Sequence, residues 1–191
     1  APIKMPRDDF GFVNAGGRLW AIGGMTGERG NVLDSVEVYD PATNIWMPGP
    51  SMPTARSSFG VALIGSQIYV IGGVDAELQV TGIVEVLDTV TGQWHKAASL
   101  PTPRMQLAAV AVGDKVWAIG GNQAIGPSFA SVDIYDPATN TWSEGPQLGT
   151  ARSALAATVF NGSIYVLGGQ DSRSQVKAVE VLAPFDQVWK V

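Results

Sequence analysis

The 191-residue sequence contains no cysteine and a single histidine, His95. The missing cysteines exclude disulfides, thiolate metal sites and cysteine nucleophiles. One histidine cannot form a multi-histidine metal centre, and no serine–histidine–aspartate set or phosphate-binding loop is evident. We therefore expect no metal, no cofactor and no catalytic residue, and we expect His95 to lie on the surface.

Positive charge and long hydrophobic runs are also scarce. The chain has 12 Lys and Arg against 17 Asp and Glu, a formal net charge of −5, and no basic run. It is therefore a poor candidate to bind nucleic acid or an anionic membrane. The longest apolar run, Leu107 to Val112, is far shorter than the ~20 residues of a membrane-spanning helix. We expect a soluble, folded protein, and its compartment is left open because no targeting signal is visible.

Glycine, in contrast, is abundant, and its spacing indicates four tandem repeats. Diglycines recur in steps of 49, 48 and 48 residues, beginning at Gly23, Gly72, Gly120 and Gly168. Tryptophans recur in steps of 48, 48 and 47 residues, at Trp46, Trp94, Trp142 and Trp189. Arginines recur in steps of 49, 48 and 48 residues, at Arg7, Arg56, Arg104 and Arg152. Three unrelated residue types share one period, so each repeat is one structural unit.

Within each repeat, alternating apolar residues bounded by turn residues predict four short antiparallel strands, a to d. Asn161-Gly162 between two apolar runs predicts a two-residue hairpin, although Asn161-Gly162-Ser163 also matches a glycosylation sequon. The sequence Asp-Pro-Ala-Thr-Asn at 40–44 and 136–140 predicts a turn that ends in a left-handed residue, a place taken by Gly92 in the second repeat. In the fourth repeat, residues 183–187 take the place of this turn sequence. No stretch has helical periodicity.

A four-stranded sheet of this size cannot bury its own faces, so similar sheets must stack around an axis as a β-propeller. The diglycines, the preceding aromatic residues, the acid in strand c and the tryptophans together resemble the kelch-repeat family over essentially the whole chain. The resemblance implies an all-β propeller of four kelch-type blades in one domain, 1–191. The repeats fall at about 7–55, 56–103, 104–151 and 152–191, the last completed by 1–6.

Three ways of completing the propeller are open. Lys4-Met5-Pro6 matches Ser51-Met52-Pro53, so the first six residues look like the end of a strand d, and the two termini would meet inside one blade. This arrangement fits a closed four-bladed ring. It also fits part of a larger ring, or two chains that pair into eight blades as a homodimer. An open ring would expose an apolar blade face.

The four repeated arginines are the first candidates for ligand binding. Each lies where strand d leads into strand a of the next blade, near the mouth of the central channel. Four guanidinium groups around this opening would attract an acidic peptide. In kelch adaptors of ubiquitin ligases, arginines at this repeat position grip acidic peptides, and this resemblance points to Arg7, Arg56, Arg104 and Arg152. The structural alternative is a buried pair with the strand-c acids Glu37, Glu85, Asp133 and Glu180.

The loops between strands b and c are the second candidate. They differ in length and sequence while their surroundings repeat, and variable loops on a rigid scaffold usually carry specificity. They span 25–35, 74–81, 122–131 and 170–177. Residues just after the diglycines are expected to point toward the channel mouth: Met25, Asp75, Asn122 and Asp171. The plain alternative is ordinary loop polarity.

These observations favour a non-catalytic module that binds a protein or an acidic peptide through the face that holds the b–c loops and the d–a segments. Two alternatives remain. One is a mutarotase- or epimerase-like kelch enzyme acting on an acidic sugar: the chain resembles the sialic acid mutarotase type only in general blade pattern, but it has the acids and arginines that this type uses at the channel mouth. This alternative would require a carboxylate of raised pKa beside an arginine in a sugar-sized pocket. The galactose oxidase type is excluded because it needs cysteine and more histidines. The other alternative is a structural propeller that associates with itself, which a mass near twice that of one chain would indicate.

Overall fold

The structure is a computed structural model that describes residues 1–27, 30–124, 126–184 and 186–191. All regular elements in these ranges are β-strands, and most of them form four antiparallel sheets. Positions 28–29 and 125 of the predicted b–c loops, and position 185 of the fourth-repeat turn, lie outside the described residues.

Each sheet corresponds to one sequence repeat and is called a blade here. Blade 1 contains β1 (Gly11–Ala15), β2 (Arg18–Ile22), β5 (Val36–Asp40) and β6 (Ile45–Pro48). Blade 2 contains β8 (Gly60–Ile64), β9 (Gln67–Ile71), β11 (Val84–Asp88) and β12 (Trp94–Ala97). Blade 3 contains β13 (Ala108–Val112), β14 (Lys115–Ile119), β15 (Val132–Asp136) and β16 (Thr141–Glu144). Blade 4 contains β17 (Ala156–Phe160), β18 (Ser163–Leu167) and β19 (Val179–Leu182), and Lys190 pairs with Val181 at its outer edge.

Short strands pair either within a b–c loop or between such a loop and a segment that connects successive blades. In the first repeat, β3 (Met25–Thr26) pairs with β4 (Asn31–Val32) inside the loop. In the second, β7 (Arg56–Ser57) pairs with β10 (Val74–Asp75). We call the connecting segments d–a segments, because each leads from strand d of one blade to strand a of the next.

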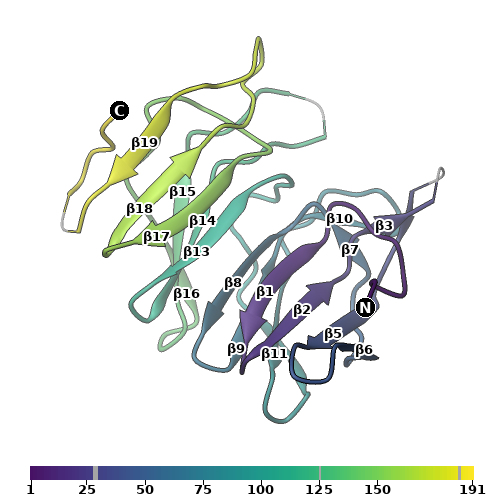
Figure 1. Cartoon of the computed structure of the whole chain (residues 1–191). Helices are drawn as coiled ribbons and strands as arrows, with labels where there is room; N and C mark the ends of the chain where they lie inside the picture. Colours follow the sequence, from purple (N-terminus) through teal and green to yellow (C-terminus); the bar gives the residue numbers. More distant parts are fainter. Residues whose placement is uncertain (28–29, 125, 185) are drawn as a thin grey trace.

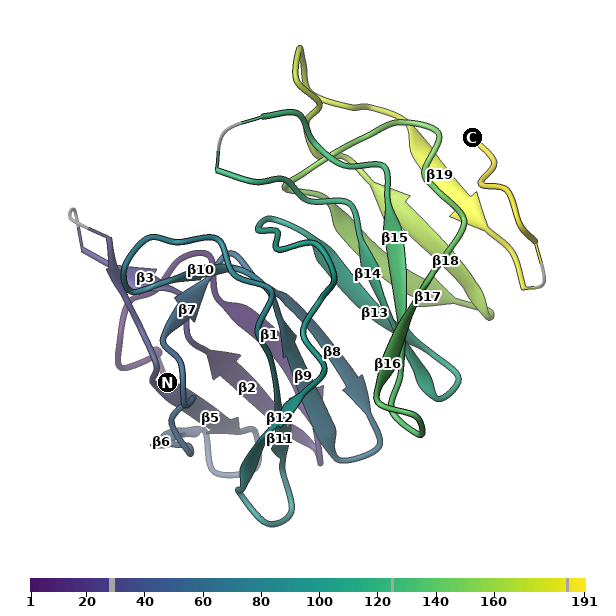
Figure 2. The same ribbon diagram turned by 180° about the vertical axis from the view of Figure 1, so that it is seen from behind.

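The blades are arranged around a common axis, with strand a of each blade innermost (Figures 1 and 2). β1 packs against β8, β8 against β13, and β13 against β17. The prediction of a β-propeller with four four-stranded units is confirmed, with β17–β19 and the Lys190 bridge forming the fourth. The termini lie apart, at opposite ends of the row of blades in both views. The completion of the fourth repeat by residues 1–6 stays a prediction.

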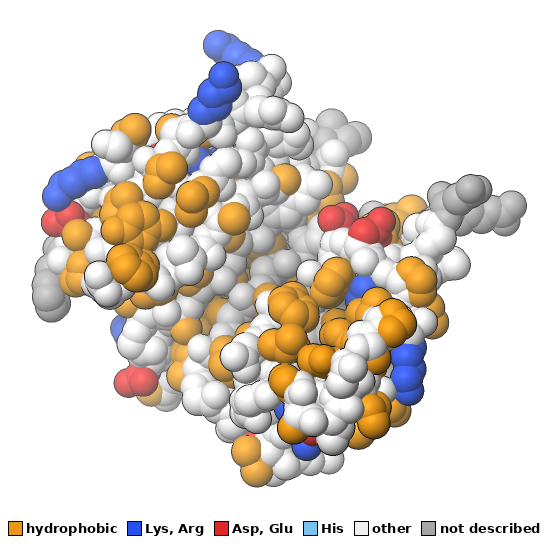
Figure 3. All heavy atoms as spheres, viewed as in Figure 1, with side chains coloured by type: hydrophobic (Ala, Val, Ile, Leu, Met, Phe, Trp, Pro, Cys, Tyr) orange, Lys and Arg blue, Asp and Glu red, His pale blue; other side chains and the backbone are white. Residues whose placement is uncertain are grey.

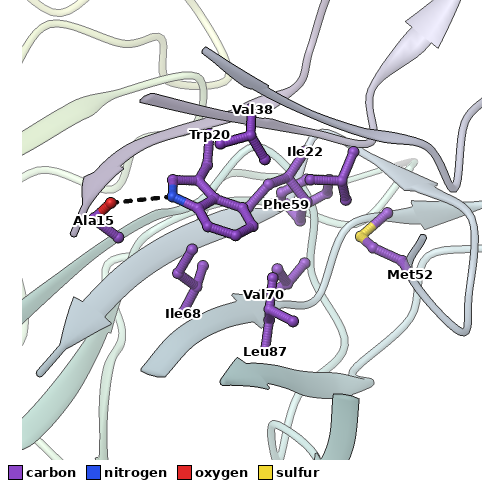
Figure 4. Close-up of a cluster of buried hydrophobic side chains, with 10 residues drawn as sticks. Ala15, Trp20, Ile22, Val38, Met52, Phe59, Ile68, Val70 and Leu87 are labelled. Carbon is purple, nitrogen blue, oxygen red and sulfur yellow. Dashed lines mark hydrogen bonds between the residues drawn. The ribbon is translucent and has the colours of Figure 1, made fainter. Parts of the chain in front are cut away.

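The hydrophobic core lies between consecutive blades rather than inside any one of them. Between blades 1 and 2, the Trp20 ring packs among Val38, Phe59 and Ile68, and its indole N–H donates to the carbonyl of Ala15 at 3.2 Å (Figure 4). Similar clusters fill the space between blades 2 and 3 and between blades 3 and 4. Alternating strand residues supply both faces of each sheet to these clusters, as the sequence pattern predicts.

The repeated tryptophans add a polar link between each strand d and the preceding d–a segment. The indole N–H of Trp94 donates to the carbonyl of Pro50 at 3.0 Å, and that of Trp142 donates to the carbonyl of Ala98 at 2.8 Å. Trp46 makes the same bond to Ala1 at 3.1 Å. Ala1 therefore lies where Pro50 and Ala98 lie in the next blades.

This placement corrects the alignment of the first six residues. The backbone N–H groups of Lys4 and Met5 donate to Glu37, as those of Gly149 and Thr150 donate to Glu180. Counting back from the arginine of each repeat, Ile3 rather than Met5 matches the buried Met52. The match of Lys4-Met5-Pro6 to Ser51-Met52-Pro53 is wrong because it depends on the Met-Pro pair and not on the distance to the arginine.

The predicted turn residues have the expected backbone. Asn44, Gly92 and Asn140 have φ angles of 56°, 72° and 54°. Asn161 and Gly162, between β17 and β18, have φ angles of 49° and 76°, and the primed hairpin turn requires positive values at both. These turn predictions are confirmed.

Candidate functional site: the channel mouth

The arginine of each d–a segment is buried and binds strands b and c of its own blade. The Nη2 of Arg56 donates to Glu85 at 2.8 Å, and both side chains are fully buried. Its Nη1 donates to the carbonyls of Gly72 and Ile83, each at 2.9 Å. One guanidinium therefore holds the diglycine, the end of the b–c loop and the strand-c acid together.

The other three blades repeat this arrangement. Each arginine bonds to the carbonyl of the first diglycine residue, to the carbonyl at the end of the b–c loop, and to the strand-c acid. The ion pairs join Arg7 to Glu37, Arg104 to Asp133, and Arg152 to Glu180. The structural alternative raised by the sequence is thus present in all four blades. No guanidinium of these described residues is more than marginally exposed, and ligand contact by the arginines stays a prediction.

The ionisation of these pairs reflects their burial. Burial lowers the pKa of Arg56 and Arg104, and attraction to Glu85 and Asp133 offsets this only in part. Burial likewise raises the pKa of Asp133 despite its bond to Arg104. Both partners of the Arg104–Asp133 pair thus shift toward neutrality, as expected when removing two charges from water costs more than their attraction returns.

The sugar-mutarotase alternative requires a carboxylate with a raised pKa beside an arginine. Asp133, however, is buried under its own blade and does not line the cavity at the channel mouth described below. Glu37 does line a cavity, with Lys4 and Met5. Burial raises its pKa, but the N–H groups of Met5 and Lys4 and the Arg7 guanidinium outweigh this, and the pKa lies below its ordinary value. Neither acid therefore combines a raised pKa with a position that faces a sugar-sized pocket.

The residues that follow the diglycines are half-buried and tie the b–c loops to the d–a segments. Met25 pairs with Asp8, and Asn122 pairs with Met105. Asp75 pairs with Arg56 and is the second residue after its diglycine, whereas Met25 is the first residue after its own. The variable loops therefore rise from fixed bases around the channel mouth.

Asp75 and Asp171 use their carboxylates to shape their own loops. The Oδ1 of Asp75 accepts from the N–H groups of Glu77 and Gln79, at 3.1 and 2.8 Å. The Oδ1 of Asp171 accepts from the N–H groups of Arg173 and Ser174, and these bonds lower its pKa. Their contact with a ligand stays a prediction.

The innermost residues of the mouth form a backbone ladder. They lie two positions after each arginine, and all have left-handed φ angles of 49–55°: Asp9, Ser58, Gln106 and Ala154. The N–H of Ser58 donates to Asp9 at 2.9 Å, that of Gln106 to Ser58 at 2.7 Å, and that of Ala154 to Gln106 at 2.8 Å. Left-handed backbone is costly for residues other than glycine and often marks functional positions.

The ladder rims a cavity of about 200 Å³ to which all four blades contribute. It is lined by the four ladder residues and by the next residue of each repeat, which is apolar in every case: Phe10, Phe59, Leu107 and Leu155. At the rim, the Oγ of Ser58 donates to the Oδ2 of Asp9 at 2.9 Å. The cavity is smaller than the ~300–1,000 Å³ of small-molecule pockets.

The sequence predicted a binding site on this face, which stays a prediction, but the sequence reasoning missed the ladder. The four residues are of four different types, and none is glycine, so no residue pattern marks them. Their shared distance from the arginine was the one available signal. His95, in β12, is exposed as expected.

Two further features bear on the kind of site. Among the described residues, no group of three or more histidines, acids or cysteines is placed to hold a metal ion. No helix in the described part of the chain has the length and hydropathy needed to cross a bilayer.

Four-stranded blades around an axis, each pinned by an arginine between its diglycine and its strand-c acid, define a propeller of the kelch type. The KLHDC2/KLHL20/DRC7 Kelch-repeats domain matches residues 9–191. The chain therefore belongs to the kelch-repeat family, and the resemblance seen in the sequence is confirmed.

Curated relatives share part of the chain. Human Kelch-like protein 33 is 38% identical over 73 residues, which is 38% of this chain and 13% of that protein. Beta-scruin of Limulus polyphemus is 34% identical over 77 residues, 38% of this chain and 8% of that protein. The mouse Influenza virus NS1A-binding protein homolog is 37% identical over 73 residues, 38% of this chain and 11% of that protein. The matches thus span a small part of each relative.

Proposed function

We propose that this chain is a non-catalytic module that recognises a protein or peptide at the channel mouth, through the b–c loops and the d–a segments. The observation that carries the proposal is the cavity at the channel mouth, because all four blades line it and its lining combines polar ladder residues with apolar residues. Such a cavity fits one apolar side chain, with a hydrogen-bonding group of the partner at the rim.

The relatives support recognition of proteins rather than catalysis. One of them is named as a binding protein for the influenza virus protein NS1A. Its match covers a short part of both chains, so it supports the general mode of action and not a particular partner.

The partner's charge is a separate matter. An acidic peptide was the expectation because four arginines lie near the mouth, but their guanidinium groups are buried in ion pairs. We therefore assign recognition to the ladder and the loops, including Met25, Asp75, Asn122 and Asp171. The arginines contribute by holding the d–a segments that carry the ladder. At the rim, Asp9 favours a partner group that donates a hydrogen bond.

The test is a selection of peptides from a displayed library against the immobilised chain, followed by binding measurements with variants. Gln106→Trp should fill the rim and reduce binding at least tenfold without changing the melting temperature. Val90→Trp, on the exposed turn after β11, is the matched control and should bind normally. Selected peptides that bind the Gln106→Trp variant at full strength would contradict the mouth as the site. A selection that enriches acidic peptides would restore the arginine-based prediction.

A further inference from the structure

Leu78, in the b–c loop of the second repeat, combines an exposed apolar side chain with an unfavourable backbone. Many exposed hydrophobic side chains gather over strands, as Figure 3 shows over β1 and β2. Leu78 instead lies in a loop, and its side chain is 64% exposed. Its φ angle of 60° lies in the left-handed region, which is costly for residues other than glycine. The chain therefore bears a backbone cost at Leu78 and gains little burial in return.

The b–c loop of the first repeat contains a similar turn with glycine at the matching place. The N–H of Leu78 donates to the carbonyl of Asp75 at 3.1 Å, and that of Gly30 donates to the carbonyl of Gly27 at 3.0 Å. Each bond joins residues i and i + 3, as in a β-turn, and Gly30 has a φ angle of 64°. Glycine adopts this backbone without steric cost. The turn by itself thus favours glycine over leucine.

Asp75 holds the turn around Leu78 in its shape. The Oδ1 of Asp75 accepts from the N–H groups of Glu77 and Gln79, and its own N–H donates to the carbonyl of Gln79 at 3.0 Å. The Nε2 of Gln79 donates to the carbonyl of Glu77 at 3.2 Å. A costly backbone conformation persists only where its surroundings over-determine it. The loop therefore presents Leu78 in a fixed position, and a contact with its side chain requires little further ordering.

The base of this loop lies beside the ladder. β10 pairs with β7, and Val74 lies opposite Ser57, the residue that precedes the ladder residue Ser58. The short strands β3, β7 and β10 lie together at one end of blades 1 and 2 (Figures 1 and 2). Leu78 thus belongs to the same face as the channel mouth.

We propose that Leu78 is a specificity-determining residue of the channel-mouth site and contacts an apolar side chain of the bound protein or peptide. The inference rests on the function proposed above and adds a contact outside the cavity. Removing an exposed leucine from water is favourable, and in the unbound chain Leu78 has little of this benefit. The neighbouring Glu77 is exposed and acidic, so the partner residue beside the apolar one should be neutral or basic.

Replacing Leu78 with glycine should move stability and binding in opposite directions. Glycine relieves the left-handed backbone, so the melting temperature should rise by about 2 °C. It also removes the apolar side chain, so peptides selected against the immobilised chain should bind about tenfold more weakly. A residue with a merely structural role would not produce both effects.

Two further variants separate the backbone of Leu78 from its side chain. Leu78→Ala keeps the backbone cost, so it should weaken binding without raising the melting temperature. Leu78→Met keeps an apolar side chain of similar size and should bind nearly as well as the unmodified chain. Val90→Gly, at an exposed apolar residue in the turn after β11, is the matched control and should leave binding unchanged.

The proposal is overturned if the Leu78→Gly chain binds the selected peptides at full strength, or if its melting temperature does not rise. Failure of this inference differs from failure of the proposed function. If only the role of Leu78 is wrong, Gln106→Trp should still abolish binding while Leu78→Gly keeps it. If the channel mouth is not the site, the Gln106→Trp chain should bind normally.

Discussion

The Nη2 of Arg56 lies 2.8 Å from the Oε2 of Glu85, and neither side chain is exposed to solvent. The pair joins a connecting segment to the third strand of the same blade, and its equivalents do so in the other blades. The arginine that recurs in every repeat thus acts within the blade, close to the mouth but beneath it.

Replacing Arg56 with methionine should strongly destabilise the protein. Glu85 would stay buried without its partner, a change that costs about 3–5 kcal/mol, and the carbonyls of Gly72 and Ile83 would each lose a donor. For a chain of this size, the melting temperature should fall by roughly 10 °C. The double variant Arg56→Met, Glu85→Leu should recover part of the loss in a urea titration. An unchanged melting temperature after Arg56→Met or Arg56→Glu would show that the guanidinium is free to serve a ligand.

Glu37 should make stability depend on pH in the acid range. Its folded pKa lies below the ordinary value of 4.5, so the unfolded chain takes up the proton first as the pH falls. Its contribution is complete above pH 4.5 and is lost as the pH falls through the folded pKa. Glu37→Gln should lower the urea midpoint at pH 7 and show a smaller decline between pH 5 and 3 than the unmodified chain. Glu77→Gln, in an exposed loop, is the control and should follow the unmodified curve.

Two glycines of the same repeat position should respond differently to alanine. Gly72 and Gly168 have φ angles of 66° and 62°, so both variants incur a similar backbone cost of about 1–2 kcal/mol. A Cβ on Gly72 would lie 2.5 Å from the carbonyl oxygen of Arg104, whereas a Cβ on Gly168 has no atom within 4 Å. Gly72→Ala should therefore cost a further ~1–3 kcal/mol. Urea titration of both variants measures the difference, and equal losses would contradict the steric contrast between the two positions.

Asn140 should stabilise the turn of blade 3 through both its backbone and its side chain. Its Oδ1 accepts from the Tyr135 hydroxyl at 2.7 Å and from the Ala98 N–H at 2.8 Å. Asn140→Gly keeps the left-handed backbone and loses these bonds, at about 1–2 kcal/mol. Asn140→Ala should lose about 1 kcal/mol more, because alanine tolerates that backbone poorly. Equal urea midpoints for the two variants would contradict the backbone part of this assignment.

The features that recur in every repeat could be predicted from the sequence. The strands, the turns at Asn44 and Asn140, and the pairing of the arginines with the strand-c acids all follow from residue types at fixed spacing. The ladder could not be predicted, because backbone geometry imposed by neighbouring blades places Gln106 and Ala154 in left-handed conformations that their side chains do not favour.

The exposure of some apolar strand residues could not be predicted from the repeat pattern either. Leu167 and Phe12 are the residues that a buried interface requires, and nothing in the sequence distinguishes them from Ile119 and Val61. Their exposure depends on whether another blade packs against them, which the residue types alone do not reveal.

The ladder at the channel mouth has a consequence for how propellers of this kind change in size. Every link uses one N–H and one carbonyl of the main chain, so no link depends on a side-chain hydrogen bond at that position. Inserting or deleting a whole repeat would widen or narrow the central opening while leaving each joint chemically the same. Blade number can thus vary without a new kind of backbone link having to arise at the mouth.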